Sequence, residues 1–499
     1  MAETLESSPF SRTDWLVCVL LFVGLSTLYF ATTSGITSSN DGSHYALTRT
    51  LVENGTFALK QYDDYAEGND IAIRDGVLYS DRPPGTALLA TLFYRLGDWL
   101  PEPLAPLPSR HDPDNPHLLY VMLLPVWAGA GTAVLLYLLL RRLGIGLGTA
   151  LTAVIMFALG TAQWKYSTVL FSHALSAFLV VLSLSLILYL YPPVGSEMAQ
   201  KPKWPHHFLL GLVLGYAVLV EYSNGLLVLL LILYLLWQIR PLSLKGLSYS
   251  FMPLLIGGII PALFLGYYNL VNFGSPFTLS YAYAINYPWA SQFRTTFSYP
   301  LLAGLQSLLV FGMGDGQCDP VCYNQGLLLL SPVLALALPG FIWYWRRSWR
   351  ACLLTTSLFL VYLLLFATHR TSHGFTADGR YLVPFLSLLI IPLAYTLAWI
   401  SRQQSSQPGW QALLTLVAYG LFFLSLRNMI LHIGFSYNYT LELDQLSHLI
   451  AAPQNWLYLG RELWPNARNL PLLWLVEGVI LLLLLGWRWA KKSRQQVEV

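Results

Sequence analysis

The sequence predicts an all-α, polytopic membrane protein with about twelve transmembrane helices. Of its 499 residues, 55% are hydrophobic and only 11% are charged, whereas ordinary soluble domains carry about 25% charged residues. Apolar runs of roughly twenty residues recur along the chain, and each is long enough to cross about 30 Å of hydrocarbon. The strands of a β-barrel would instead alternate in polarity. The net charge of +3 gives no indication of nucleic-acid binding.

The expected spans follow one another through short connections and three long polar loops. No clear small-residue cleavage pattern follows the first apolar run, so we expect it to remain as a signal anchor. An apolar stretch at 300–313 would reverse the later basic loops if it crossed, so we expect it to dip into the membrane or lie flat. The expected spans are 15–33, 118–140, 146–163, 168–191, 208–220, 226–239, 251–272, 327–345, 352–368, 381–400, 411–430 and 472–487.

The basic residues predict the orientation, because Lys and Arg concentrate in cytosolic loops. Both termini are expected in the cytosol, and the polar loops 34–117, 273–325 and 431–470 are expected on the other side. We divide the chain into a core at 15–272, which includes the loop 34–117, and a variable part at 273–499. The residues that agree are Arg141, Arg142, Lys201, Lys203, Arg240, Lys245, Arg346, Arg347, Arg350, Arg402, Lys491 and Lys492.

The first outer loop holds the polar residues that most need explaining. A helix over 42–53 is predicted, with Asp41 among the residues suited to its N-cap. Asp41, His44 and Tyr45 then share one helix face. The bland reading of Asp41 is an N-cap carboxylate, and the functional reading is a general base at a membrane face. Capping would also fix the direction of the carboxylate, so the two readings are compatible.

The same loop continues through an acidic segment at 61–70, which has no periodicity and is predicted to be exposed. Pro83-Pro84 suits the first turn of a further helix, which is too short to span and is expected in the interface plane. Arg82 precedes that helix. A guanidinium beside free backbone N–H groups is a good phosphate site, although a snorkelling interface arginine is a common alternative.

Other ionisable residues lie at the outer ends of the spans. Arg380 has the same two interpretations as Arg82, and Asp378 would pair with it or cap its helix. Glu221 follows a short apolar run, where an ionisable group is either functional or reaches the interface. His173 is expected to bond a neighbouring helix or to support the site, and Lys165 is expected at the interface.

No motif of a soluble nucleotide or metal enzyme is present in the sequence. It has no phosphate-binding Gly-rich loop, no HExxH and no nucleophile elbow. Cys318 and Cys322 form a weak metal signal, and a local disulfide between them is the more plausible reading in an outer loop. An enzyme acting on the outer face would therefore need an activated donor that is already in the membrane.

Four short stretches carry a resemblance to a known family: NDGSHYALTRTLVENG, YSDRPPGTALLA, YNLVNFGSPFTLSY and DGRYLVP. With the topology, they resemble GT-C glycosyltransferases, and among these the bacterial protein-mannosyltransferase/aminoarabinose-transferase-like superfamily (glycosyltransferase family 39-like). The resemblance implies a GT-C fold and a sugar donor carried on a polyprenyl phosphate. It also implies inverting transfer to an acceptor hydroxyl on the extracytoplasmic face, with the acceptor a lipid, a glycan or a protein.

The resemblance also implies roles for individual residues. Asp41 matches the acidic position of the first loop, which implies the general base. Arg82 stands where relatives often have Lys or Arg before Pro-Pro, which implies contact with the carrier phosphate, and Arg380 would assist it. Many relatives have a second acid directly after the first, but Gly42 stands there in this chain. A divalent metal is therefore left open, and Glu221 or the Asp63/Asp64 pair would have to supply any second carboxylate.

A transporter is the alternative of a different class, in the form of a flippase for lipid-linked sugars, and an inactive relative acting as a scaffold is a third. Transporters tend to show two similar halves and charged or broken helices at mid-membrane. In this chain the halves are dissimilar and the polar residues gather in outer loops, which favours the enzyme.

Overall fold

The computed structural model describes residues 10–191, 204–238, 244–310, 326–371, 376, 378–402, 408–435 and 463–497. Cys318 and Cys322 lie outside these residues. The described chain is mostly helical, with one short hairpin. The longer helices are α1 (Arg12–Ala31), α2 (Ser39–Arg49), α3 (Gly85–Leu96), α5 (Leu123–Arg142), α6 (Leu147–Gly160), α8 (Ser172–Leu190), α9 (Trp204–Val220), α10 (Gly225–Gln238), α11 (Leu244–Phe273), α13 (Leu301–Leu309), α15 (Ala337–Ala367), α16 (Leu386–Arg402), α17 (Pro408–Phe435) and α20 (Leu470–Val497).

Shorter elements complete the described chain. They are the strands β1 (Ile71–Arg74) and β2 (Val77–Ser80), the α-helical turns α4 (Pro116–Val121), α7 (Gln163–Tyr166), α12 (Phe293–Thr296) and α14 (Leu327–Leu330), the π-helical turn η1 (Thr50–Asn54), and the 3₁₀ turns η2 (Lys60–Ala66), η3 (Tyr222–Asn224), η4 (Ser280–Tyr283), η5 (Pro288–Ser291), η7 (Pro332–Leu336), η8 (Arg380–Phe385) and η10 (Ala467–Asn469).

Every expected span coincides with an apolar helix. Within the described residues, eight helical segments are long and apolar enough to cross a membrane, and three shorter ones are apolar. The chain is therefore an integral membrane protein. The spans expected at 327–345 and 352–368 form one long helical segment that bends at Ser348, whose φ and ψ are not helical. The count of about twelve crossings stays a prediction, because the three shorter helices and this bend decide it.

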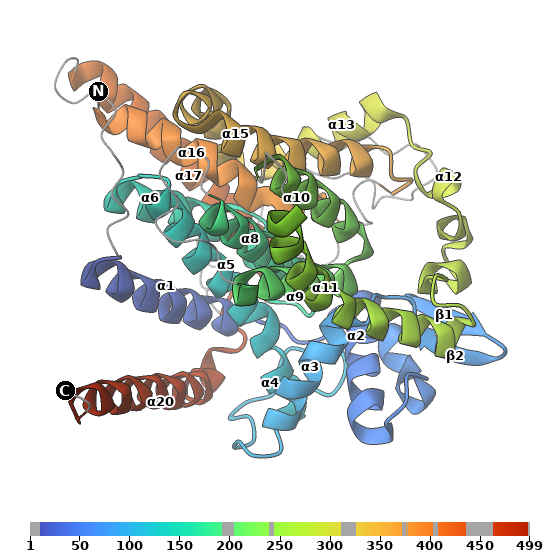
Figure 1. Ribbon diagram of the computed structural model, residues 1–499. Coiled ribbons are helices and arrows are strands. Elements are labelled where there is room, and N and C mark those ends of the chain that lie inside the picture. Colours follow the sequence, from blue (N-terminus) through green and yellow to red (C-terminus); the bar gives the residue numbers. More distant parts are fainter. Residues whose placement is uncertain are drawn as a thin grey trace, which may run out of the picture.

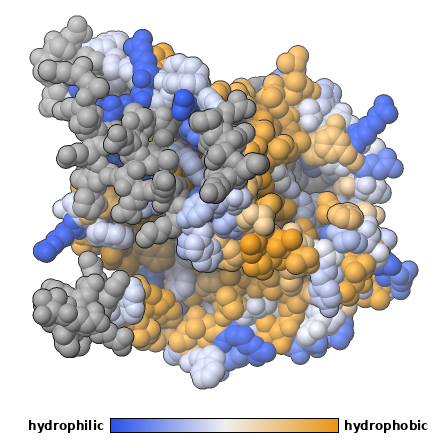
Figure 2. Space-filling view, viewed as in Figure 1, coloured by the Kyte–Doolittle hydropathy of each residue, from blue (hydrophilic) through white to orange (hydrophobic). Residues whose placement is uncertain are grey.

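The helices lie roughly side by side, with polar elements at one end (Figure 1). The start of α1 and the end of α20 lie at the left of that view. The two helices contact each other near the end of α1 and the start of α20, where Trp474 donates to Thr27. The hairpin and α12 lie at the opposite end. Figure 2 shows a broad apolar face, with hydrophilic residues toward its edges. The start of α1 and the end of α20 thus lie far from the hairpin of the first loop in this view.

The acidic segment predicted to be exposed is instead folded. It forms η2 and leads into the antiparallel hairpin β1–β2, so the segment is ordered, while half of its residues are exposed as predicted. The hairpin is the one correction that the expected all-α fold needs. The hairpin turns at Asp75 and Gly76, which both have positive φ, as the common two-residue turn of right-twisted strands requires. The hairpin buries Asp70, which is 5% exposed.

Helix α2 begins three residues earlier than predicted. Its N-cap is Ser38, and Asp41 occupies the third helical position of a capping box. Asp41 is therefore not the N-cap residue. Gly42 faces the backbone of η2 so closely that a Cβ would overlap the carbonyl of Tyr65. This contact explains physically why the second acid of related sequences has no room in this chain.

Helix α3 matches the expected short amphipathic helix after Pro83-Pro84. Its buried face includes Ala87, Ala90 and Tyr94, while Leu92 is 67% exposed. The helix starts against the end of α9, where a Cβ on Gly85 would meet the backbone of Leu219 and Val220 at 2.6 Å. Helix α13 has nine residues, about 14 Å of helix, so it is too short to cross the membrane, as expected.

Candidate active site

The end of the β1–β2 hairpin presents two adjacent charged residues. Arg82 pairs through Nη2 with Asp70, and its Nε lies 2.9 Å from Asp81 Oδ1. Ser39 at the start of α2 donates to Asp70 Oδ2 at 2.5 Å, and Ser43 donates to the Asp70 carbonyl at 2.8 Å. The first turns of α2 thus hold the hairpin, and the hairpin holds Arg82.

Asp81 is a buried acid that sequence reasoning missed. It is 0% exposed, and apart from the ion pair of Oδ1 with Arg82 neither carboxylate oxygen has a hydrogen-bond partner among the described residues. Burial raises the pKa of Asp81 to about 7, although the positive charge of Arg380 opposes the rise. The only sequence feature that could have pointed to Asp81 is its position directly before Arg82. A carboxyl group poised near neutral pH is typical of functional sites.

Arg380 approaches the same region from the other half of the chain. It begins η8, the first turn of a membrane-spanning helix, as predicted, and is 9% exposed. Its guanidinium lies over the rings of Phe171, at 5.3 Å, and Tyr381, at 5.5 Å. Its Nε has no hydrogen-bond partner, and no carboxylate pairs with it in the described part of the chain. Arg380 is therefore a buried cation that no described carboxylate contacts directly, although its charge acts on Asp81 and Glu221.

Electrostatic interactions join further predicted residues to the two arginines. Glu221 is partly buried and accepts a hydrogen bond from Ser172 at 2.8 Å. Desolvation raises the pKa of Glu221, opposed by Ser172 and by the charges of Arg82 and Arg380. Burial, and then the charge of Arg82, lower the pKa of His44 to about 3. The charges of both arginines thus act on Glu221, and the charge of Arg82 acts on His44.

His173 is the second residue of α8 and borders the same region. Its ring meets Tyr166 edge-on with centroids 5.0 Å apart, and it meets Tyr381 at 6.3 Å. Nδ1 of His173 has no hydrogen-bond partner among the described residues. Tyr45 packs elsewhere, against Tyr65 and Tyr94, although it shares α2 with His44.

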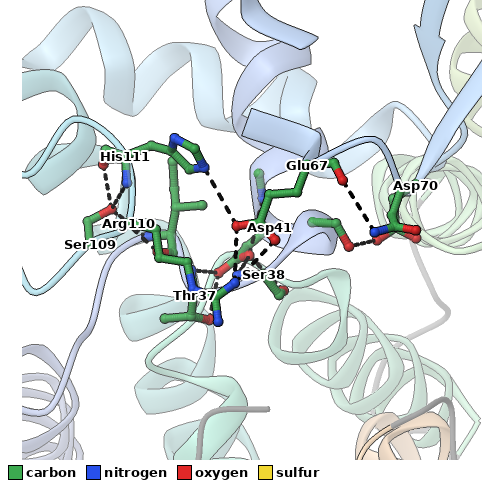
Figure 3. Close-up of polar contacts among 12 residues, drawn as sticks. Thr37, Ser38, Asp41, Glu67, Asp70, Ser109, Arg110 and His111 are labelled. Carbon is green, nitrogen blue, oxygen red and sulfur yellow. Dashed lines mark hydrogen bonds and ion pairs between the residues drawn. The ribbon is translucent and has the colours of Figure 1, made fainter. Parts of the chain in front are cut away.

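Asp41 is buried and held by the turn before α2 (Figure 3). Oδ2 accepts from the backbone N–H and the hydroxyl of Thr37, at 2.8 and 3.1 Å, and Oδ1 accepts from the same groups of Ser38, both at 2.8 Å. Desolvation raises the pKa of Asp41, while these hydrogen bonds oppose the rise. Asp41 follows Ser39 by two residues in α2. Ser39 donates a hydrogen bond to Asp70, which in turn pairs with Arg82.

Asp378 does not pair with Arg380 in the structure. Its Oδ2 instead lies 3.1 Å from Lys165 Nζ and 2.8 Å from His432 Nε2. Lys165 is 2% exposed, so the expectation of an interfacial lysine is wrong, because a buried carboxylate compensates its charge.

The Asp63/Asp64 pair lies on η2, where Asp64 is exposed. Asp70 is the acid of that run that reaches Arg82. No three His, Cys, Asp or Glu side chains in the described ranges are grouped as metal ligands would be.

Comparison with known proteins matches this arrangement to one fold. Residues 89–276, from within α3 to the loop after α11, match the family model of dolichyl-phosphate-mannose-protein mannosyltransferase. The structure resembles ArnT from Cupriavidus metallidurans bound to undecaprenyl phosphate, with a TM-score of 0.53 and 14% identity over 93% of this chain and 76% of ArnT. The protein has the GT-C glycosyltransferase fold.

A second solved structure supports the same GT-C fold. The oligosaccharyltransferase of Archaeoglobus fulgidus, in complex with zinc and sulfate, matches with a TM-score of 0.53 and 12% identity over 90% of this chain. This chain spans 57% of that protein. No curated protein matches the sequence closely enough to be counted. The resemblance to GT-C glycosyltransferases expected from the four sequence stretches is confirmed.

Proposed function

We propose that the protein is a glycosyltransferase that moves a sugar from a polyprenyl-phosphate carrier to an acceptor hydroxyl on the extracytoplasmic face. The observation that carries the proposal is the pair of guanidiniums, Arg82 from the first loop and Arg380 from a distant helix. Arg380 is buried with no described carboxylate in direct contact, and a buried charge is costly unless an anion lies against it.

The leaving group is a phosphate, so negative charge grows on its oxygen as the bond to the sugar breaks. Arg82 and Arg380 stabilise that charge, and guanidiniums suit phosphate oxygens because they donate several hydrogen bonds in a fixed plane. Preorganised donors of this kind act strongly in a water-excluded site. Arg82 would exchange part of its pairing with Asp70 and Asp81 for the phosphate.

Asp41 is proposed as the general base. The acceptor oxygen attacks the anomeric carbon, its proton passes to Asp41, and the carbon–oxygen bond to the carrier phosphate breaks. Attack from the side opposite the phosphate inverts the anomeric centre. The hydroxyls of Thr37 and Ser38 occupy lone pairs of Asp41, so they must rotate away while the two backbone N–H groups keep the carboxylate in place.

Asp81 and Glu221 are proposed to serve in place of the second acid that Gly42 excludes. Both carboxyl groups have a raised pKa and lie within the field of Arg380. If a divalent metal takes part, these carboxylates would hold it, and it would help to neutralise the phosphate charge. The residues in this chain then orient the donor and move the acceptor proton.

The test uses purified protein in lipid vesicles with undecaprenyl-phosphate-linked sugars. We expect release of free undecaprenyl phosphate that depends on an acceptor, and a fall of about 10²–10³-fold in rate for Arg82→Gln and Arg380→Gln. Asp14→Asn is the matched control, because it removes a buried acid at the opposite end of the bundle, beside Arg141. Movement of the intact lipid-linked sugar across the bilayer without bond cleavage would instead favour the flippase.

A further inference from the structure

A buried ion cluster lies next to Arg380 and has no part in the mechanism so far. It consists of Asp378, Lys165 and His432. Lys165 Nζ is 3.1 Å from Asp378 Oδ2 and 3.0 Å from His432 Nε2, which is itself 2.8 Å from Asp378 Oδ2. The side chains of Lys165, His432 and Asp378 are 3%, 8% and 0% exposed. Lys165 comes from α7, Asp378 from the segment just before η8, and His432 from α17.

The second carboxylate oxygen of Asp378 is occupied as well. Tyr166 donates its hydroxyl to Oδ1 at 2.8 Å, and Thr376 donates to the same atom at 2.6 Å. Asp378 therefore has no free lone pair for a substrate. A buried ion pair is weak evidence for stability, because desolvation offsets much of the attraction. The arrangement instead fixes geometry, since one carboxylate ties together three separate elements.

Two physical connections run from this cluster to Arg380. The first is the backbone, because Asp378 precedes Arg380 by two residues and Gly379 between them has a left-handed φ of +41°. The second is the aromatic ring under the guanidinium. Tyr166 packs against Phe171 with centroids 5.5 Å apart, and Arg380 lies over Phe171 at 5.3 Å. The cluster thus holds both the start of η8 and the ring on which Arg380 rests.

We propose that Asp378, with Lys165 and His432, is a positioning cluster that holds the Arg380 guanidinium in place for an anionic phosphate. The pairing also satisfies the charge of Lys165, so Arg380 rather than Lys165 is the cation left for the ligand. This inference rests on the proposed function, and it assigns these three residues a role that acts through Arg380.

A double-mutant cycle on ligand binding tests the cluster without relying on turnover. The affinity of the full-length protein for undecaprenyl phosphate is measured for wild type, Asp378→Asn, Arg380→Gln and the double variant. We expect Arg380→Gln to weaken binding by roughly 10- to 100-fold, as for loss of a charged hydrogen bond. Asp378→Asn is expected to weaken it by a comparable factor, and the double variant to bind no more weakly than Arg380→Gln alone.

Asp14→Asn is the control for losing a buried ion-paired carboxylate, because Asp14 pairs with Arg141 and Tyr137. It is expected to lower thermal stability and leave the affinity unchanged. If Asp378→Asn does not fold, His432→Gln keeps a polar side chain and should give a smaller, equally non-additive loss. Full additivity of Asp378→Asn with Arg380→Gln, or unchanged affinity in Asp378→Asn, overturns the positioning role. An unchanged affinity in Arg380→Gln would instead contradict the proposed donor site itself.

Discussion

At the scale of single residues, the site depends on buried charged groups whose hydrogen bonds are incomplete. Asp81 and Arg380 are both removed from water, and each lacks a hydrogen-bond partner on at least one polar atom. Arg82 already shares two carboxylates. A buried guanidinium that no carboxylate contacts is costly, and its cost falls when an anionic ligand binds beside it.

The buried carboxyl of Asp81 predicts a pH dependence of stability. Its pKa of about 7 lies above the ordinary value of 3.8, so the folded protein holds this proton more tightly than the unfolded chain. The stabilisation that this proton gives the folded protein is complete below about pH 4 and is lost as the pH rises toward about 7. Thermal unfolding in detergent should show that Asp81→Asn removes this part of the fall. The same pH dependence in Asp81→Asn and wild type would show that another group is responsible.

Asp41→Asn tests the general base and the capping box together. Asparagine offers an NH₂ group where Thr37 or Ser38 donates, so we expect a loss of about 1–3 kcal/mol in the free energy of unfolding. The protein should still fold and insert, while transfer falls by about 10²–10⁴-fold with unchanged affinity for undecaprenyl phosphate. Ser38→Ala removes one hydroxyl donor and keeps the carboxylate, so it should lose stability but retain transfer. Most of the activity surviving in Asp41→Asn rejects the base assignment.

The local positions of the arginines were easier to predict from the sequence than the partners of the carboxylates. Arg82 lies just before α3 and Arg380 begins η8, as the local pattern predicts, while their roles stay proposals. Lys165 and Asp378 are 213 residues apart in sequence, so nothing local indicates that they pair. Asp70 was hidden in a run of acids, and only the hairpin shows that it, rather than Asp63 or Asp64, reaches Arg82.

At the scale of elements, the close approach of α2 and η2 shapes the first loop. Gly42→Ala would place a Cβ on the Tyr65 carbonyl, so η2 must move away, at a cost of about 1–3 kcal/mol. We expect a lower unfolding temperature and weaker transfer, because the shift disturbs the hairpin that holds Arg82. Gly24→Ala is the control, since nothing lies within 4 Å of its Cβ position. Equal unfolding temperatures for the two variants would contradict this packing.

The hairpin is the element that sequence reasoning missed. Asp75-Gly76 is a common two-residue hairpin turn, but the flanking strands have four residues each and lie in a polar run without clear alternation. The start of α2 was misplaced for a related reason. Several residues before it suit an N-cap, and only the hydrogen bonds between Ser38 and Asp41 select one.

At the scale of the whole molecule, hydrophobicity predicted the helices well, because each apolar run must satisfy its own backbone hydrogen bonds in the membrane. Each of the twelve expected ranges coincides with an apolar helix of the described chain, although one helical segment, 332–367, contains two of them. The division into 15–272 and 273–499 stays a prediction. The hydrophobic core is continuous across that boundary, and Arg380 from the second part meets Phe171 from the first.

The orientation of the chain gives a prediction at this scale. In a variant whose four native cysteines are replaced, Asp75→Cys, at a side chain that is 84% exposed, should react with a membrane-impermeant thiol reagent added to intact cells. Gly148→Cys, at the opposite end of the bundle, should react only after permeabilisation. The reverse pattern would place the first loop in the cytosol and remove the extracytoplasmic site.

The central claim is that Arg82 and Arg380 together receive the phosphate of a lipid carrier. An experimental structure of the protein with bound undecaprenyl phosphate tests it most directly. The account predicts phosphate oxygens about 2.7–2.9 Å from nitrogen atoms of both guanidiniums, with Asp41 on the opposite side of the sugar position. A phosphate bound elsewhere, with Arg82 still paired to both Asp70 and Asp81 and Arg380 without a ligand, would contradict it.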